Sequence, residues 1–222
     1  MKAIILAGGR GKRLNPITDF VPKPLVPIQN IPIIEWQIKY LKKFNVSEVI
    51  ICTGYKTKMI ENHFKLKKIG VKIKYSIEKT PLGTGGAIKK AGKMINDKSF
   101  FVINGDTITN IDLNKLRKKS NSIAAIELRT KYGILETDDE KIIRFKEKKE
   151  IPETWMNAGI YHLQKDILKE LPVKGDIEKT LFPDYAKKGQ LNTIKFKNTK
   201  WYSVDSFKDM EDCSLEIQKI IK

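Results

Sequence analysis

The chain has 222 residues, 41% of them hydrophobic, which suits a single domain large enough to bury a substantial core. It contains no apolar run long enough to cross a membrane and no signal-peptide pattern at its N-terminus, so we expect neither a membrane partner nor secretion. The formal net charge of +17 arises mostly from lysines spread along the whole chain without interleaved aromatic residues, so we expect solvated lysine faces and no nucleic-acid partner.

Strand and helix patterns alternate through the first half of the chain. Ile34, Ile38 and Leu41 share one face of an expected amphipathic helix. Because continuous apolar strands separated by helices imply parallel pairing, the sequence predicts an α/β fold with a doubly wound, mostly parallel, Rossmann-like sheet. The expected strands are residues 2–7, 48–54, 71–77 and 99–106, and the expected helices are residues 32–45, 56–64 and 84–95.

Short strand patterns separated by turns dominate the second half. They predict a small antiparallel lobe built onto the same sheet. The expected strands are residues 122–130, 132–138, 141–148 and 157–163, and helices are expected near residues 176–181 and 208–221.

Three motifs coincide with the carboxyl ends of the expected parallel strands, where ligands bind in sheets of this kind. The stretch ILAGGRGKRL spans the end of the first strand, EKTPLGTGG follows the third, and NGD ends the fourth. Because these strand ends meet at one edge of the sheet, we expect the three motifs to form one binding site.

The opening glycine-rich loop matches neither of two common phosphate-binding patterns. Leu14 stands where the GxGxxG motif needs its third glycine, and Leu6 and Arg13 break the P-loop pattern. The glycines nevertheless let backbone N–H groups approach a phosphate closely, and Lys12 and Arg13 add positive charge. A purely structural glycine turn is the alternative.

Lys23 lies between two prolines in the stretch VPKPLVPI. Each proline fixes its own φ and biases the preceding residue toward extended geometry. A lysine held so rigidly favours a positioned phosphate ligand, and a stiff surface loop is the alternative.

LAGGRGKRLNPIT followed by PKPLVPI resembles the N-terminal motif of the sugar-1-phosphate nucleotidyltransferases, with Lys12 where threonine is frequent. Four further stretches match the family in order: EKTPLGTGGAI, NGD, YGILE with FKEK, and NAGIY. The resemblance covers most of the chain. Within KIKYSIEKTPLGTGGAI it points to the short mannose-1-phosphate and D-glycero-D-manno-heptose-1-phosphate guanylyltransferases.

The resemblance implies one nucleotidyltransferase domain over residues 1–222 without a left-handed β-helix. Its nucleotide-binding half would be residues 1–110, and residues 111–222 would form the sugar-binding half and the C-terminal helix.

The implied reaction is an Mg²⁺-dependent, in-line attack of a sugar 1-phosphate on the α-phosphorus of a nucleoside triphosphate, which releases pyrophosphate. The attacking phosphate is already ionised, so catalysis would consist of positioning and charge neutralisation without a general base. The resemblance implies that Arg13 stabilises the pyrophosphate and Lys23 the α-phosphate region. The implied nucleotide-binding residues are Leu6, Ala7, Gly8, Gly9, Gly11, Glu78, Pro81, Gly83 and Thr84.

Two aspartates are the implied Mg²⁺ ligands. Asp106 ends the strand FFVINGD, although a turn residue there is the alternative. The family usually supplies its second metal aspartate in a W-x-D-x-G-T context, whereas this chain reads WYSVDSFKD. Strict register gives Ser203, but the stretch is similar to the glucose-1-phosphate cytidylyltransferase variant, which makes Asp205 the candidate.

The resemblance also implies a sugar-phosphate site. Glu147 and Asn157 have the right chemistry for sugar hydroxyls. Lys148 would suit the phosphate, although its run of charges would be solvated in any protein. The implied residues are Gly133, Glu147, Lys148, Asn157 and Gly159.

Glu78 aligns with the position that faces the base in this family. An ionised carboxylate only accepts hydrogen bonds, and the Watson–Crick edge of guanine offers two adjacent donors. GTP is therefore the favoured nucleotide, with a manno-configured sugar phosphate as partner.

Several alternatives stay open. The same reaction could use UTP, dTTP or CTP with a glucose-1-phosphate or an amino-sugar phosphate. The altered C-terminal aspartate motif is also compatible with an inactive nucleotide-binding relative, and the basic charge with a nucleotide-binding regulatory or nucleic-acid-binding protein.

The widely separated Cys52 and Cys213 predict reduced thiols and a cytoplasmic location. A homodimer is an open possibility.

Overall fold

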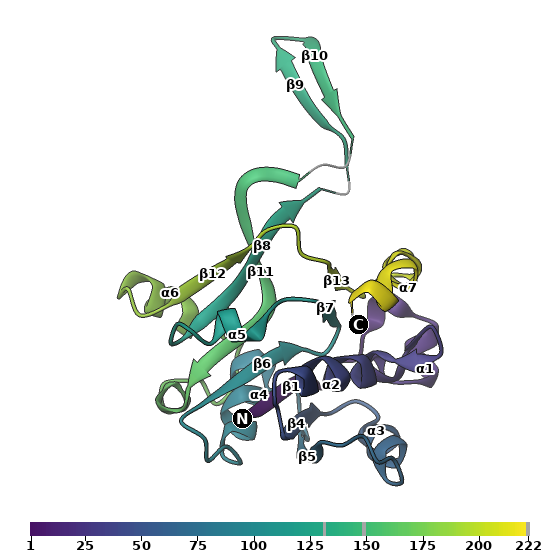
Figure 1. The fold of residues 1–222 in the computed structure, drawn as a ribbon, viewed down its shortest axis with the longest axis vertical. Coiled ribbons are helices and arrows are strands. Elements are labelled where there is room, and N and C mark those ends of the chain that lie inside the picture. The colour runs from purple at the N-terminus through teal and green to yellow at the C-terminus, as the bar shows by residue number, and fades with distance from the viewer. Residues whose placement is uncertain (131, 148–149, 221–222) are drawn as a thin grey trace.

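A seven-stranded sheet forms the centre of the computed structural model, which describes residues 1–130, 132–147 and 150–220 (Figure 1). The strand order is β12-β8-β11-β6-β1-β4-β5. The bounds are β1 (Lys2–Ala7), β4 (Glu48–Thr53), β5 (Lys72–Ile77), β6 (Ser99–Asn104), β8 (Ser122–Arg129), β11 (Glu150–Gln164) and β12 (Asn192–Phe196).

Most neighbours in this sheet are parallel, as the sequence predicts. β1 pairs in parallel with both β4 and β6, and β4 with β5, whereas β11 runs antiparallel to β6 and β8. The chain builds outward from β1 through β4 to β5 and then returns to the other side of β1 as β6. Such a reversal of strand order opens a crevice at the carboxyl ends of the two strands that flank it, here β1 and β6.

Helices cover both faces of the sheet because side chains of the strands alternate between them. On β1, Ala3 and Ile5 pack with the buried residues of α2, α3 and α5, while Ile4 packs on the other side with α4 and α6. The bounds are α1 (Ile17–Phe20), α2 (Ile33–Lys43), α3 (Thr57–Phe64), α4 (Gly83–Gly92), α5 (Leu113–Leu116), α6 (Leu181–Lys187) and α7 (Phe207–Ile220). Among the described residues, no helix is long and apolar enough to span a membrane.

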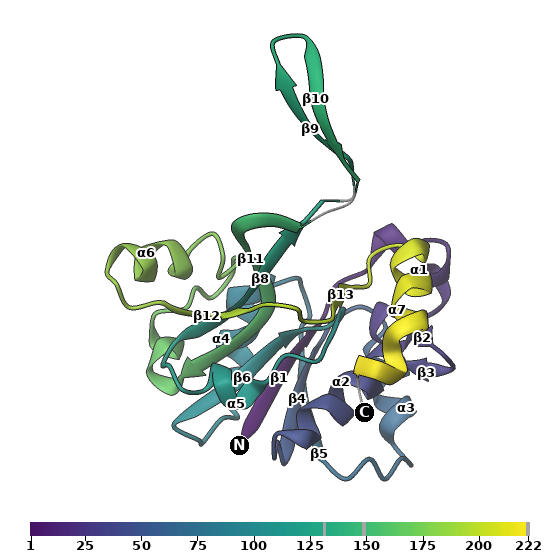
Figure 2. The same cartoon turned by 45° about the horizontal axis from the view of Figure 1, so that its top comes forward.

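The C-terminal helix α7 belongs to a third, smaller core next to the N-terminal segments. Cys213 and Ile217 of α7 pack with Ile28 of the short strand β2 and with Trp36 of α2. Figure 2 shows α7 beside β2 and α1. The remaining short elements are β2 (Pro27–Ile28), β3 (Ile31–Pro32), β7 (Thr107–Thr109), β13 (Trp201–Ser203) and the 3-10 turns η1 (Lys12–Leu14), η2 (Lys23–Leu25) and η3 (Lys165–Lys169).

The hairpin of β9 (Ile134–Asp138) and β10 (Lys141–Lys146) projects away from the sheet (Figures 1 and 2). Within residues 132–147 and the other described parts of the chain, these strands pair only with each other, so they form the separate antiparallel part of the second half. The other two predicted strands of that half, β8 and β11, instead extend the central sheet. The parallel edge strand β12 was not predicted, because its alternation of polar and apolar residues is short.

The helix predicted near residues 176–181 is wrong by about one turn, since α6 begins at Leu181. Asp176 accepts a hydrogen bond from the backbone N–H of Thr84 at 3.4 Å, and Ile177 donates one to the Thr84 hydroxyl at 3.0 Å. These contacts hold the segment against the glycine-rich turn before α4, so the backbone forms turns there instead of a helix.

We expect His162 of β11 to make folding stability pH-dependent. It is 4% exposed, and its Nδ1 bonds the carbonyl of Lys119 at 2.9 Å. Burial lowers its pKa, an effect that Arg117 strengthens and the Lys119 bond opposes. The unfolded chain therefore takes up a proton at higher pH than the folded chain, and stability falls as the pH drops below about 6.5.

We expect His162→Asn, which keeps a donor for Lys119, to flatten this dependence. The free energy of unfolding, measured by urea titration between pH 7 and pH 5, would fall more steeply for the parent chain than for the variant. Equal slopes would show that His162 is not the titrating group.

Candidate active site

The glycine-rich loop follows β1 and packs against two other predicted motifs. A Cβ atom on Gly8 would lie 2.8 Å from Oε1 of Glu78, so the close approach of loop and glutamate requires glycine. Gly11 has a φ of 65°, and a Cβ atom there would lie 2.9 Å from Cβ of Lys23. Both glycines are therefore required by local packing, which brings the loop to Glu78 on one side and to Lys23 on the other.

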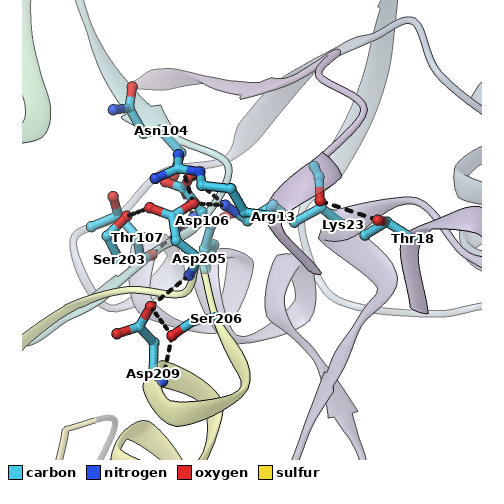
Figure 3. A network of polar contacts seen from close by, with 12 residues as sticks. Arg13, Thr18, Lys23, Asn104, Asp106, Thr107, Ser203, Asp205, Ser206 and Asp209 are labelled. Carbon is cyan, nitrogen blue, oxygen red and sulfur yellow. Dashed lines mark hydrogen bonds and ion pairs between the residues drawn. The ribbon is translucent and has the colours of Figure 1, made fainter. Parts of the chain in front are cut away.

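Lys23 reaches into the crevice and touches two carboxylates (Figure 3). Its Nζ lies 2.7 Å from Oδ2 of Asp106 and 2.6 Å from Oδ1 of Asp205, and its side chain is only 12% exposed. The backbone N–H of Val26 donates to the Lys23 carbonyl at 3.0 Å, which closes the 3-10 turn η2 directly after Pro22. Lys23 is thus held in the crevice rather than on a solvated loop.

A strand pair and a helix cap bring Asp205 to Asp106. β13 pairs antiparallel with β7, and the backbone N–H of Val204 donates to the Asp106 carbonyl at 3.0 Å. At the start of α7, Asp209 donates its backbone N–H to the Ser206 hydroxyl at 3.2 Å. In return the Asp209 carboxylate accepts from that hydroxyl at 2.8 Å and from the backbone of Asp205 at 3.1 Å. This reciprocal cap fixes Asp205 just outside the helix.

Ser203 and Asp205, the two candidates from the register of the aspartate motif, lie side by side. The hydroxyl of Ser203 donates to Oδ2 of Asp205 at 2.9 Å, so the serine orients the carboxylate and Asp205 faces Lys23. Burial raises the pKa of Asp205, but Lys23, Ser203 and Arg13 together outweigh it and hold that pKa below its ordinary value. Asp205 is therefore an anion at neutral pH.

Arg13 occupies the outer side of this cluster. Its Nη2 lies 2.9 Å from Oδ1 of Asp205, while its side chain is 75% exposed. A mostly exposed guanidinium bound at one end keeps donors free for a second anion.

Two adjoining cavities contain most of the predicted nucleotide-binding residues. The first is lined by Ala7, Gly11, Arg13, Lys23 and Asp205. The second is lined by Gly8, Glu78, Pro81, Gly83 and Thr84. Leu6, Gly9, Gly105 and Asp106 line both, so the cavities form one continuous crevice above the ends of β1 and β6.

Glu78 directly follows β5 and lines the second cavity. Oε2 accepts the backbone N–H of Leu82 at 3.1 Å. Burial raises the pKa of Glu78, and the Leu82 bond and the charge of Lys90 oppose this only in part. A half-buried acceptor with one oxygen against Gly8 suits recognition of hydrogen-bond donors on a ligand.

Glu178 was missed by the sequence analysis, yet it joins two predicted parts of the site. Its carboxylate accepts from the Thr84 hydroxyl at 2.5 Å and from the Tyr161 hydroxyl at 2.9 Å. Tyr161 in turn accepts from the Asn157 side chain at 2.9 Å. Glu178 lies in none of the family motifs identified above. The sequence offered only one hint of a buried position for it, namely its place next to Ile177, which is buried in the structure.

The predicted sugar-site residues are distributed over two places. Asn157 and Gly159 lie on β11 near the crevice, where Gly159 has a φ of 69° and a Cβ atom there would lie 2.5 Å from the Asn104 amide. Gly133 and Glu147 lie at the base of the projecting hairpin, line neither cavity, and Gly133 packs under the Phe145 ring. Lys148 lies outside the described residues. A role in sugar binding stays a prediction for all five.

The chemistry of Asp106 and Asp205 suits a hard divalent cation, and their role as metal ligands stays a prediction. Both carboxylates reach a single Lys23 Nζ, so their oxygens face a common position. No group of three or more acidic, histidine or cysteine ligands occurs in the part of the chain that the structure describes. Mg²⁺ commonly binds through one or two carboxylates and completes its octahedron with phosphate oxygens and water, so two aspartates suffice.

The family model described as nucleotidyl transferase matches residues 2–220. The chain belongs to the nucleotidyl transferase family. It is 42% identical over 194 residues to the D-glycero-alpha-D-manno-heptose 1-phosphate guanylyltransferase of Campylobacter jejuni, covering 84% of this nucleotidyltransferase and 87% of that protein. It is 36% identical to the mannose-1-phosphate guanyltransferase beta-A of Xenopus laevis, covering 94% of this chain and 62% of that one.

Solved structures agree with this membership. The crystal structure of HddC from Yersinia pseudotuberculosis has a TM-score of 0.78 and 30% identity to this nucleotidyltransferase, covering 97% of this chain and 99% of that one. The same protein complexed with GMP-PN has a TM-score of 0.75. The predicted enzyme class and the predicted resemblance to guanylyltransferases are thereby confirmed.

Proposed function

We propose that this nucleotidyltransferase joins a manno-configured sugar 1-phosphate to GTP, giving a GDP-sugar and pyrophosphate. The observation that carries the proposal is the meeting of Lys23, Arg13, Asp106 and Asp205 in the crevice next to the cavity that contains Glu78. The names of the Campylobacter and Xenopus relatives support both the guanine nucleotide and the sugar class.

The phosphate chemistry follows from the charges of the first cavity. Gly9 and Gly11 line the cavity, so their backbone N–H groups would bind the phosphates, and Lys23 would neutralise charge that develops at the α-phosphorus. Arg13, with free donors beside Asp205, would hold the departing pyrophosphate. The sugar phosphate attacks as an anion, so holding both substrates in line is the main task of these residues.

Asp106 and Asp205 would hold Mg²⁺, which when bound would supply positive charge to offset that of the phosphates. For this, Lys23 must release at least one of the carboxylates that it contacts at 2.7 and 2.6 Å. The released ammonium would then remain beside the phosphates, where its positive charge would offset their negative charge.

Discrimination between bases is assigned to Glu78. Guanine offers N1–H and the 2-amino group to an ionised carboxylate, whereas uracil offers a single donor between two acceptors. We expect Glu78→Gln to lower kcat/KM for GTP by about 10- to 100-fold, because the new amide meets the 2-amino group donor to donor. The same variant would gain relative activity with UTP, since glutamine matches the N3–H and O4 of uracil.

Steady-state kinetics of both proteins with GTP and UTP test this expectation, with thermal unfolding as the folding control. A variant that kept its preference for GTP unchanged would remove Glu78 from base recognition. Because the pKa of Glu78 is raised, the GTP preference of the parent enzyme should also weaken as the pH falls and the carboxyl takes up a proton.

The function as a whole is tested by a matrix of nucleoside triphosphates against sugar 1-phosphates, read by pyrophosphate release with Mg²⁺ present. We expect GTP with mannose 1-phosphate or a manno-heptose 1-phosphate to give the highest rate. If UTP, dTTP or CTP gave the highest rate instead, the assignment of the base would be wrong while the enzyme class would stand.

A further inference from the structure

Arg10 brings a positive charge to the cavity that contains Glu78. Arg10 lies in the loop GGRGKR, and it lines that cavity together with Gly8 and Glu78. Within the described residues, no carboxylate forms an ion pair with Arg10, although Glu78 lines the same cavity. A guanidinium without an anionic partner keeps its donors available for acceptors on a ligand.

The ring of Tyr55 holds the guanidinium in place. The Cζ atom of Arg10 lies 5.1 Å from the ring centroid, within the range of a cation–π contact. Tyr55 is itself fixed at both ends, because its backbone N–H donates to the Gly8 carbonyl at 3.2 Å and its hydroxyl to the Thr18 carbonyl at 3.0 Å. The stacked guanidinium is therefore oriented by the same glycine loop that packs against Glu78.

The cavity thus presents acceptors on Glu78 and donors on Arg10, with Gly8 beside the glutamate. Guanine carries the complementary pattern along one continuous edge: the donors of the 2-amino group and N1–H are followed by the acceptors O6 and N7. Adenine has an amino donor beside N7, and uracil and thymine have no N7 at all. Cytosine has one amino donor followed by the acceptors N3 and O2. Guanine alone presents two adjacent donor groups followed by two adjacent acceptors, which suits the two carboxylate oxygens of Glu78 and the paired donors of Arg10.

Resting on the proposed function, we propose that Arg10 is a specificity-determining residue that binds O6 and N7 of guanine while Glu78 binds N1–H and the 2-amino group. The paired donors of the guanidinium suit the adjacent O6 and N7 acceptors, a geometry that arginine commonly uses for guanine. Tyr55 acts as a positioning residue that limits the rotation of Arg10.

The test compares GTP with 7-deaza-GTP, in which a carbon replaces N7 and one acceptor of the pair is lost. The parent enzyme should use GTP with a kcat/KM about tenfold higher than 7-deaza-GTP. In Arg10→Met, which retains the stem but no donors, the two nucleotides should become equivalent, and kcat/KM for GTP should fall about 10- to 100-fold. Arg117→Met, at an exposed arginine that follows α5, is the matched control.

Each other outcome has a definite meaning. An equal loss on GTP, 7-deaza-GTP and UTP in Arg10→Met would assign Arg10 to the phosphates and overturn the inference. Parent enzyme that used GTP and 7-deaza-GTP equally well would overturn it too, while leaving guanylyl transfer intact. Parent enzyme that did not use GTP at all would contradict the proposed function and the inference together. Arg10 is exposed, so thermal unfolding of the variant should match that of the parent.

Discussion

Replacing Lys23 with methionine should lower kcat about a thousandfold, which corresponds to about 4 kcal/mol of transition-state stabilisation. Methionine retains much of the apolar stem but removes the only ammonium that contacts both Asp106 and Asp205 in the described structure. The developing charge on the α-phosphate would then lack its counter-ion. Pyrophosphate release under saturating substrates measures the effect.

Lys58→Met provides the matched control for Lys23→Met, because Lys58 is exposed on α3, away from the crevice. The pKa of Asp205 should rise in Lys23→Met, since Lys23 is the largest of the influences that lower it. Circular dichroism at the assay temperature separates lost chemistry from lost folding. Turnover of a folded Lys23→Met within tenfold of the parent would exclude Lys23 from the mechanism.

Substitution of Asp205 should mainly reduce catalytic activity, whereas substitution of Asp209 should mainly reduce folding stability. Asp205→Asn preserves the shape and the contact with Ser203 but removes a charge from the crevice, so we expect a loss of roughly a hundredfold or more in kcat/KM. Asp209→Ala removes the cap of α7 and should cost about 1 kcal/mol of folding stability with a smaller effect on turnover.

Thermal unfolding and steady-state kinetics of the two variants, each measured over a range of Mg²⁺ concentrations, distinguish the roles. A partial recovery of Asp205→Asn at high Mg²⁺ would support a metal-binding role. A folded Asp209→Ala that lost as much activity as Asp205→Asn would instead show that the cap, rather than the charge of Asp205, determines turnover.

The central sheet could be predicted because its strands are continuous and apolar. The strand 2–7 is specified by a continuous apolar run and the helix that contains Ile34, Ile38 and Leu41 by its helical periodicity, and both are confirmed. The predicted meeting of loop motifs also follows from a general property of parallel sheets, namely that ligands bind at the carboxyl ends of their strands.

What could not be predicted depends on contacts between distant segments. β7 and β13 are three residues each, too short for a periodic signal, yet their pairing decides that Asp205 rather than Ser203 faces Lys23. The role of Glu178 likewise appears only when Thr84 and Tyr161 are brought to it. The orientation of the β9–β10 hairpin has no local signal either, because an isolated hairpin with exposed apolar residues gives the same pattern as one that packs on a core.

The separation of Lys23 from Asp205 by 182 positions has a consequence for synthesis of the enzyme. A growing chain on the ribosome carries the glycine loop and the lysine long before the aspartate that faces them has been translated. The cluster closes only when α7 docks beside β2 and α2, so the proposed site would be complete only after residues 205–220 have been translated. With the role proposed above for Asp205, ribosome-bound chains that stop before this residue would not turn over nucleotide.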